Sequence, residues 1–207
     1  MKTNTARLPL LSPVRYGIAV CAFLASAILA IAVTAADTAP QELLLSDFEI
    51  PHAQRQWLRP SNPRKSPLEY VSIPERVKQG KTSGRWSDLP VNKHLQLADV
   101  PVDWSAYEAL VFWLYSETNN GQQLSIVLTS PRSTDIPDDR SSYYRHTFTV
   151  DWTGWRQVVV PFTRFAPNKS PGGWSRITRF VIYADGWKGS ALPDTVLYFD
   201  DMKLVAR

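Results

Sequence analysis

The chain has 207 residues, with 23 Lys and Arg against 19 Asp and Glu, and a single cysteine. That cysteine, Cys21, lies in the N-terminal segment, so the remainder has no thiol and its stability must come from a hydrophobic core. Residues 1–36 hold three basic residues and no acidic one, which leaves 20 basic against 19 acidic residues in the rest. The basic pI of about 9.2 therefore gives no argument for a nucleic-acid partner.

The first 36 residues have the three parts of a secretory signal peptide. Basic residues come first, an unbroken apolar run follows over residues 17–33, and Thr34-Ala35-Ala36 supplies small residues for cleavage. We expect residues 1–36 to be a signal peptide and residues 37–207 to be one domain exported to the periplasm or outside the cell. The run is also long enough for an uncleaved membrane anchor, and only that alternative predicts a membrane contact.

The rest of the chain predicts an all-β fold. Eight Trp, sixteen Pro and short β-branched or aromatic runs between turn residues are typical of a sandwich or barrel. In chain order, the expected strands are residues 43–49, 109–116, 124–130, 143–150, 157–162, 177–184 and 195–204. Residues 51–76 contain five prolines, which lack a backbone N–H, and predict a long loop; residues 130–142 predict a second loop.

A weak internal repeat assigns side chains to the two faces of the strands. The segments 104–113, 152–161 and 174–183 align without gaps, and each reads as a Trp-led turn before a strand. Because side chains alternate along a strand, one parity of residues is expected in the core. These core residues are Leu110, Phe112, Leu124, Ile126, Leu128, Phe148, Val150, Val158, Val160, Phe180 and Ile182.

The opposite parity mixes large aromatic side chains with charged and hydroxyl ones. The residues expected to bind ligand there are Trp113, Tyr115, Tyr143, Arg145, Tyr183 and Asp185. An aromatic plane accepts the apolar face of a pyranose ring, while Arg145 and Asp185 could bond its hydroxyls. We therefore expect a polysaccharide or oligosaccharide ligand on an aromatic sheet face. In the alternative, Trp113 and Tyr115 form a second small core beneath the 51–76 loop.

Acidic residues occur at both ends of the expected domain. Asp47 and Glu49 belong to the first strand, and Asp200 and Asp201 to the last. First and last strands commonly adjoin in jelly rolls, and converging carboxylates of this kind favour Ca²⁺. Alternatively, these carboxylates are solvated or paired with Lys81, Arg85 or Lys203.

No catalytic residue is predicted. His52, His94 and His146 lack the spacing of a metal pair, and no phosphate loop, nucleophile elbow or HExxH motif occurs. Two alternatives to a binding protein stay open. One is a polysaccharide lyase or glycoside hydrolase on the same sandwich, using Tyr143, Arg145 and His146 as base and charge neutraliser. The other is a protein-interaction or assembly module.

Four segments carry a family resemblance: residues 46–49 (SDFE), 80–84 (GKTSG), 154–165 (GW, VPF and Phe165) and 198–202 (YFDDM). With them the chain resembles the galactose-binding-like jelly-roll carbohydrate-binding modules that accompany polysaccharide lyases and glycoside hydrolases. The same framework also serves in an assembly-factor family. The resemblance implies a non-catalytic jelly-roll β-sandwich that binds sugar on the aromatic parity. It also implies a structural calcium at Asp47, Glu49 and Asp201, with backbone carbonyls near residues 81–83.

Overall fold

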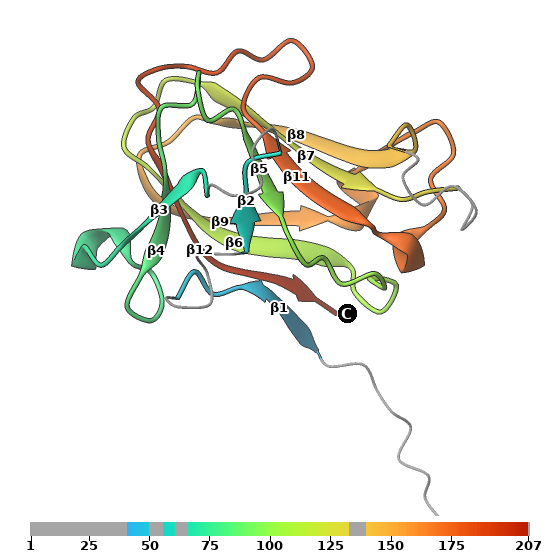
Figure 1. Cartoon of the computed structure of the whole chain (residues 1–207). Helices are drawn as coiled ribbons and strands as arrows, with labels where there is room; N and C mark the ends of the chain where they lie inside the picture. Colours follow the sequence, from blue (N-terminus) through green and yellow to red (C-terminus); the bar gives the residue numbers. More distant parts are fainter. Residues whose placement is uncertain (1–40, 50–55, 61–65, 133–139, 207) are drawn as a thin grey trace, which may run out of the picture. The chain divides into compact units, whose positions relative to one another are not determined.

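The computed structural model describes residues 41–49, 56–60, 66–132 and 140–206 (Figure 1). The chain divides into residues 1–37 and a compact unit of residues 38–207, and every described residue belongs to the second unit. The expected signal peptide or anchor lies outside the described residues. Among the residues that are described, no helix is long and apolar enough to cross a membrane.

The described chain is built from strands and short 3-10 turns. In chain order the strands are Glu42–Ser46 (β1), Trp57–Leu58 (β2), Leu68–Val71 (β3), Ser83–Trp86 (β4), His94–Leu97 (β5), Ala109–Ser116 (β6), Gln122–Thr129 (β7), Tyr143–Val150 (β8), Gly154–Pro161 (β9), Ala166–Asn168 (β10), Arg179–Tyr183 (β11) and Leu197–Val205 (β12). The 3-10 turns are Pro74–Arg76, Phe162–Arg164 and Trp174–Arg176.

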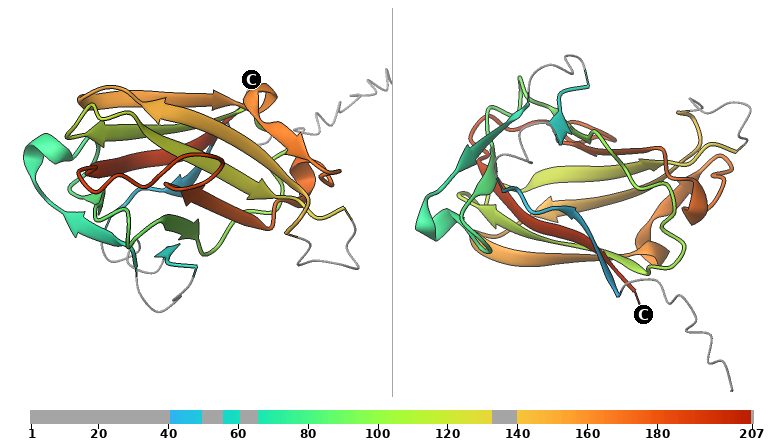
Figure 2. Two further views of the ribbon diagram at one scale, coloured as in Figure 1. Left: turned by 90° about the horizontal axis from the view of Figure 1, so that it is seen from above. Right: turned by 60° about the horizontal axis from the view of Figure 1, so that its bottom comes forward.

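The strands form two antiparallel sheets. Sheet A has the order β3-β4-β12-β6-β9, with β1 also paired to β12, and sheet B has the order β10-β8-β7-β11-β5-β2. Figures 1 and 2 show the two sheets as layers that face each other. Apart from β3–β4 and β7–β8, the neighbouring strands in each order are separated by other strands in the sequence, so most pairings are long-range. This architecture confirms the predicted all-β sandwich.

The core lies between the sheets and contains the parity of residues that alternation predicted. Leu110, Phe112, Leu124, Ile126, Leu128, Val150, Val158, Val160, Phe180 and Ile182 are all buried, and the partly buried Phe148 packs against them. Three tryptophans, Trp57, Trp86 and Trp104, are fully buried beside them. Trp57 joins the sheets by packing on Phe48 and Phe180, with ring centres 5.7 and 5.9 Å apart. Such aromatic pairs supply large buried area without any disulfide.

The long loop predicted at residues 51–76 needs correction. Its described part forms β2, β3 and the turn Pro74–Arg76. Both strands are the last members of their sheets, where the prolines interrupt no ladder: Pro67 directly precedes β3 and Pro74 starts the turn. The rest of that prediction, and most of the loop predicted at 130–142, falls on residues 50–55, 61–65 and 133–139, outside the described residues.

Candidate functional site

The six residues expected to bind ligand lie on different sheets. Trp113 and Tyr115 belong to β6 in sheet A. The other four lie in sheet B or directly after it: Tyr143, Arg145, Tyr183 and Asp185. Since the inward parities of both sheets meet in the core, the outward parities point away from each other. The structure therefore corrects the prediction of one aromatic face. Alternation assigns a side chain to a face of its own sheet, but not to a particular sheet.

The aromatic residues of sheet A are covered by the segment around its 3-10 turn. The guanidinium carbon of Arg76 lies 4.1 Å from the centre of the Tyr115 ring, and Lys78 Nζ lies 4.1 Å from the centre of the Trp113 ring. Both contacts have cation–π geometry. Tyr115 thus lies under Arg76, the last residue of the predicted 51–76 loop, whereas Trp113 lies under Lys78, beyond that loop, and both rings are only partly buried. The alternative of a small second core beneath residues 51–76 stays a prediction.

The pairing register defines the outward surface of sheet B, here called the sheet B outer face. Its rows are His94–Tyr183–Ser125–Thr147, Gln96–Val181–Val127–Arg145 and Arg179–Thr129–Tyr143–Asn168. Four small side chains in the middle are buried: Ser125, Val127, Thr129 and Val181. Large aromatic, cationic and amide side chains therefore surround a floor of small ones.

Trp187, in the turn after β11, is the exposed aromatic residue of the sheet B outer face. Its side chain is 39% exposed. Its ring centre lies 5.6 Å from that of Tyr183 and 6.0 Å from that of Tyr143, both edge-to-face. The guanidinium carbon of Arg145 lies 4.8 Å from the centre of the same ring. Three residues expected to bind ligand thus gather around an aromatic residue that was not predicted.

The turn of residues 185–189 places Trp187 over the sheet. Trp187 and Lys188 have φ angles of 51° and 79°, in the left-handed region that non-glycine residues seldom occupy. A Cβ at Gly189 would lie 3.3 Å from Gln123 Cβ on β7, so the turn lies close against sheet B. The Gly189 N–H closes the turn by donating to the Gly186 carbonyl at 3.0 Å.

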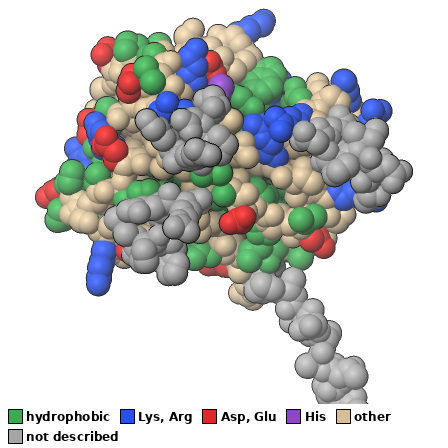
Figure 3. Space-filling model, in the orientation of Figure 1, with side chains coloured by type: hydrophobic (Ala, Val, Ile, Leu, Met, Phe, Trp, Pro, Cys, Tyr) green, Lys and Arg blue, Asp and Glu red, His purple; other side chains and the backbone are tan. Residues whose placement is uncertain are grey.

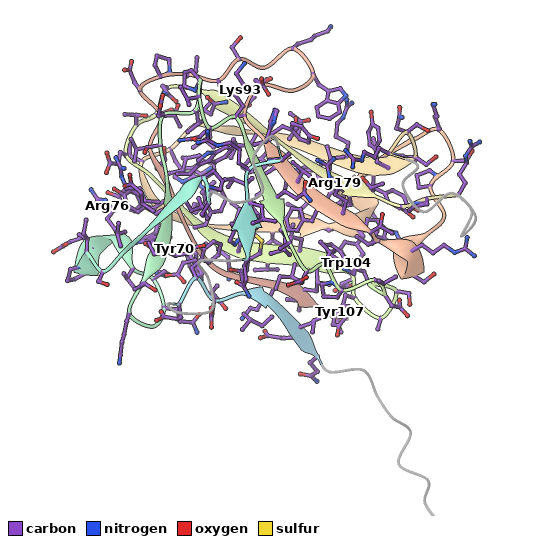
Figure 4. The ribbon with its side chains drawn as sticks, in the orientation of Figure 1. Tyr70, Arg76, Lys93, Trp104, Tyr107 and Arg179 are labelled. Atoms are coloured by element: carbon purple, nitrogen blue, oxygen red, sulfur yellow. The ribbon has the colours of Figure 1, made fainter. Side chains whose placement is uncertain are left out.

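Asp185 begins this turn and connects it to β5. His94 Nε2 lies 2.9 Å from Asp185 Oδ1, and Lys93 Nζ lies 3.2 Å from Asp185 Oδ2. Partial burial opposes ionisation of Asp185, but the hydrogen bonds and charges of His94 and Lys93 outweigh it and lower its pKa. The His94 ring also packs edge-on against Tyr183, with centres 4.6 Å apart. Figure 4 labels Lys93 beside this part of sheet B.

His146 does not join Tyr143 and Arg145. It has the opposite parity on β8, and its ring lies beside Phe148 and Phe165, with ring centres 6.1 and 5.7 Å away. Burial lowers the pKa of His146, and its ring nitrogen lies 3.3 Å from the Arg164 carbonyl oxygen. The geometry therefore gives no support to the enzyme alternative that used these three residues together.

Asp47 and Glu49 lie directly after β1, not within the first strand as predicted, yet they converge with the acidic residues of β12 because β1 pairs with β12. Asp47, Glu49, Asp200 and Asp201 line one pocket with Gln79 and Gly80. We call these four residues the terminal acidic cluster. Gly80 has a φ of +72°, and a Cβ there would lie 2.2 Å from Glu49 Oε1, so a glycine is needed for this approach.

The oxygens of the terminal acidic cluster bind backbone N–H groups and one lysine. Glu49 Oε1 accepts the N–H groups of Lys81 and Thr82 at 2.7 and 3.0 Å. Asp200 Oδ2 accepts two further backbone N–H groups, and burial raises the pKa of Asp200 to about 6. Asp201 Oδ2 lies 3.2 Å from Lys203 Nζ. Within the described residues, no three acidic or histidine side chains are arranged to hold a metal. The calcium site stays a prediction.

A family comparison identifies the domain. The model of the carbohydrate binding domain (family 11) matches residues 32–171, more than half of the chain. The chain belongs to this family. Carbohydrate is therefore its ligand class, which favours sugar binding over the protein-interaction alternative. The matched segment ends before β11, so Tyr183, Asp185 and Trp187 lie beyond it. No curated protein matches the chain.

Solved structures agree with the family 11 assignment in fold. The family 11 carbohydrate-binding module of the cellulosomal cellulase Lic26A-Cel5E of Clostridium thermocellum superposes with a TM-score of 0.53 at 16% identity, over 82% of this chain and 96% of the module. An exo-beta-agarase superposes with a TM-score of 0.53 at 10% identity, over 81% of this chain but only 25% of the agarase. These likenesses show the shared sandwich.

Several residues of the sheet B outer face were missed from the sequence: Lys93, His94, Gln96, Arg179 and Trp187. One signal was available, since Asp185-Gly-Trp-Lys-Gly189 places a tryptophan between two glycines directly after a strand. Of the other four, His94 and Gln96 lie on β5, Lys93 directly precedes it, and Arg179 starts β11. Strand β5 itself was not predicted, because a four-residue strand gives too short a pattern.

Proposed function

We propose that this family 11 domain binds a polysaccharide chain on the sheet B outer face, around Trp187. The observation that carries the proposal is the convergence of Tyr143, Arg145 and Tyr183 on this exposed ring. The tyrosines and Arg145 fix the orientation of the indole. An aromatic plane held in this way can stack on the C–H face of a pyranose without losing much side-chain entropy on binding.

Polar groups around Trp187 match the edges of a sugar ring. Gln96 and Arg179, joined by a 3.0 Å hydrogen bond, lie on one side of the buried floor, and the His94–Asp185 pair lies on another. An amide both donates to and accepts from hydroxyls, a guanidinium donates to them, and a carboxylate accepts from them. Binding of this kind requires no proton transfer, so we propose a non-catalytic role.

We also propose that the domain is exported. The support is the leader pattern of residues 1–36, with basic, apolar and small-residue parts in that order. Intact-mass measurement of the protein from a periplasmic or secreted fraction is expected to show cleavage after Ala35 or Ala36. A mass that retains residues 1–36 would instead support the uncleaved anchor.

Binding measurements on paired variants test the sugar site. Trp187→Ala is expected to weaken binding to the best polysaccharide of a panel by roughly tenfold or more, equivalent to about 1.4 kcal/mol. Affinity electrophoresis or calorimetry gives the readout. Trp113→Ala is the matched control, because Trp113 is on sheet A and its ring lies under Lys78. The proposal fails if no polysaccharide binds, or if both variants weaken binding equally while circular dichroism shows both folded.

A further inference from the structure

Charge is distributed unevenly between the two sheets. The strands of sheet B contain no aspartate or glutamate, but they contain Arg145 and Arg179, both on the outer face. Sheet A, by contrast, has carboxylates in β1, β3 and β12. The strands of sheet A also contain Arg85, Arg156 and Lys203, so their charges are of both signs, whereas the arginines of the sheet B strands have no acidic residue among them.

Asp185, which follows β11 and begins the turn that carries Trp187, does not offset the two arginines. Asp185 directs one carboxylate oxygen at His94 and the other at Lys93. Within the described residues, no carboxylate forms an ion pair with Arg145 or Arg179. The side chain of Arg179 instead donates to the Gln96 amide oxygen at 3.0 Å. Figures 3 and 4 share one orientation, and a basic patch in Figure 3 lies where Figure 4 labels Arg179.

Arg145 is placed to bind an anion in the plane of its guanidinium. Its guanidinium carbon lies 4.8 Å from the centre of the Trp187 ring, a contact made through the cation rather than through a hydrogen-bond acceptor. Guanidinium N–H donors lie in the plane of the group and match the two oxygens of a carboxylate or sulfate. The aromatic ring thus orients this guanidinium without neutralising it.

The two arginines are spaced along the face. Arg145 lies on β8 and Arg179 on β11, with only β7 between them, so their strands are about 10 Å apart. The buried floor residues Val127 and Thr129 separate them in register. A chain lying across this floor beside Trp187 would pass both guanidinium groups. The two guanidinium groups are donors only, so they match the oxygens of an anionic group along that chain.

We propose that the sheet B outer face selects an anionic polysaccharide, one that carries carboxylate or sulfate groups, through Arg145 and Arg179. This inference rests on the proposed sugar site around Trp187 and names its ligand class. Carboxylate and sulfate groups both present negatively charged oxygens to a guanidinium. In a polysaccharide, the carboxylates belong to uronic acids and the sulfates to sulfate esters.

Two pairs of polysaccharides separate charge from backbone. Polygalacturonate and its methyl ester differ in carboxylate charge, and a sulfated galactan and its desulfated form differ in sulfate charge. Wild-type protein is expected to bind the charged member of at least one pair roughly tenfold more tightly. The pair that shows this preference identifies the anion. The preference is also expected to shrink as ionic strength rises.

Charge-removing variants assign that preference to the face. Arg145→Gln and Arg179→Gln are each expected to reduce it to roughly threefold or less. Arg85→Gln is the matched control, because Arg85 pairs with Glu69 at 2.7 Å on sheet A, and it should keep the full preference. An equal loss in Arg85→Gln would indicate non-specific attraction and overturn the proposal.

Two further outcomes separate the anionic preference from the sugar site itself. If both members of each pair bind equally and Trp187→Ala weakens both, the sugar site stands and the anionic preference is wrong. If no polysaccharide of either charge binds, the proposed function itself fails.

Discussion

Trp187 shows how one residue determines the character of a surface. Its left-handed φ of 51° costs backbone energy of order 1 kcal/mol or more, which the packing around the turn must offset. Gly189 lets the turn lie close against β7, and the ring then contacts Tyr143 and Tyr183 from two different strands. Alternation could not predict this contact, since a turn residue has no strand parity.

At Asp185, a partly buried ion pair couples the turn to β5. We expect Asp185→Asn to destabilise the protein by about 1 kcal/mol at neutral pH, because His94 and Lys93 lose their anionic partner. The folded-state pKa of Asp185 is lowered, so its contribution is present above the unfolded pKa of about 4 and is lost as the pH falls through the folded value. The stability difference between variant and wild type should therefore shrink in acid.

Urea unfolding of both proteins across the acid range measures this difference. Asp151→Asn is the matched control, since the Asp151–Arg156 pair is exposed and should contribute little. A difference that stays constant with pH would contradict the ion-pair account of Asp185.

At the scale of elements, β4 depends on a glycine that lets an aromatic side chain approach it. A Cβ at Gly84 would lie 2.6 Å from Cδ1 of Phe48, which is fully buried between Trp57 and Phe199. Gly84→Ala is therefore expected to lower the free energy of unfolding by about 1–3 kcal/mol. Gly186→Ala is the control, because its Cβ would meet only ordinary contacts. Equal unfolding midpoints in denaturant for the two variants would contradict this packing.

Strand patterns predicted more of the fold than of the site. Long strands such as β6 and β8 have the predicted bounds, because each is an eight-residue run rich in aromatic and β-branched side chains. Alternation is a property of a single strand, however, and pairing depends on contacts between distant strands. Trp113 and Tyr183 share a parity, yet β6 and β11 belong to different sheets. Short strands such as β2 were missed because two residues form no pattern.

At the scale of the whole molecule, the terminal acidic cluster joins the two ends of the domain. Backbone N–H groups of residues 78–82 bond to Glu49 near the first strand and to Asp200 in the last strand. The adjacency of β1 and β12 was predicted from the sequence and is confirmed. The hydrogen bonds that hold the two ends together were not predicted, because every residue type except proline has a backbone N–H, and residue types therefore do not show which N–H groups donate. Hydrogen bonds and calcium are two different means of satisfying the same carboxylates.

Thermal unfolding in calcium and in a chelator distinguishes those two means. If calcium binds at Asp47, Glu49 and Asp201, saturating calcium should raise the Tm by about 5–10 °C relative to EDTA. Magnesium should do less, because it demands a tighter octahedral shell. Glu49→Gln should abolish the response, whereas Glu69→Gln, at the exposed pair with Arg85, should keep it. Equal Tm values in calcium and EDTA would show that the N–H hydrogen bonds alone close the domain, and the calcium prediction would then be wrong.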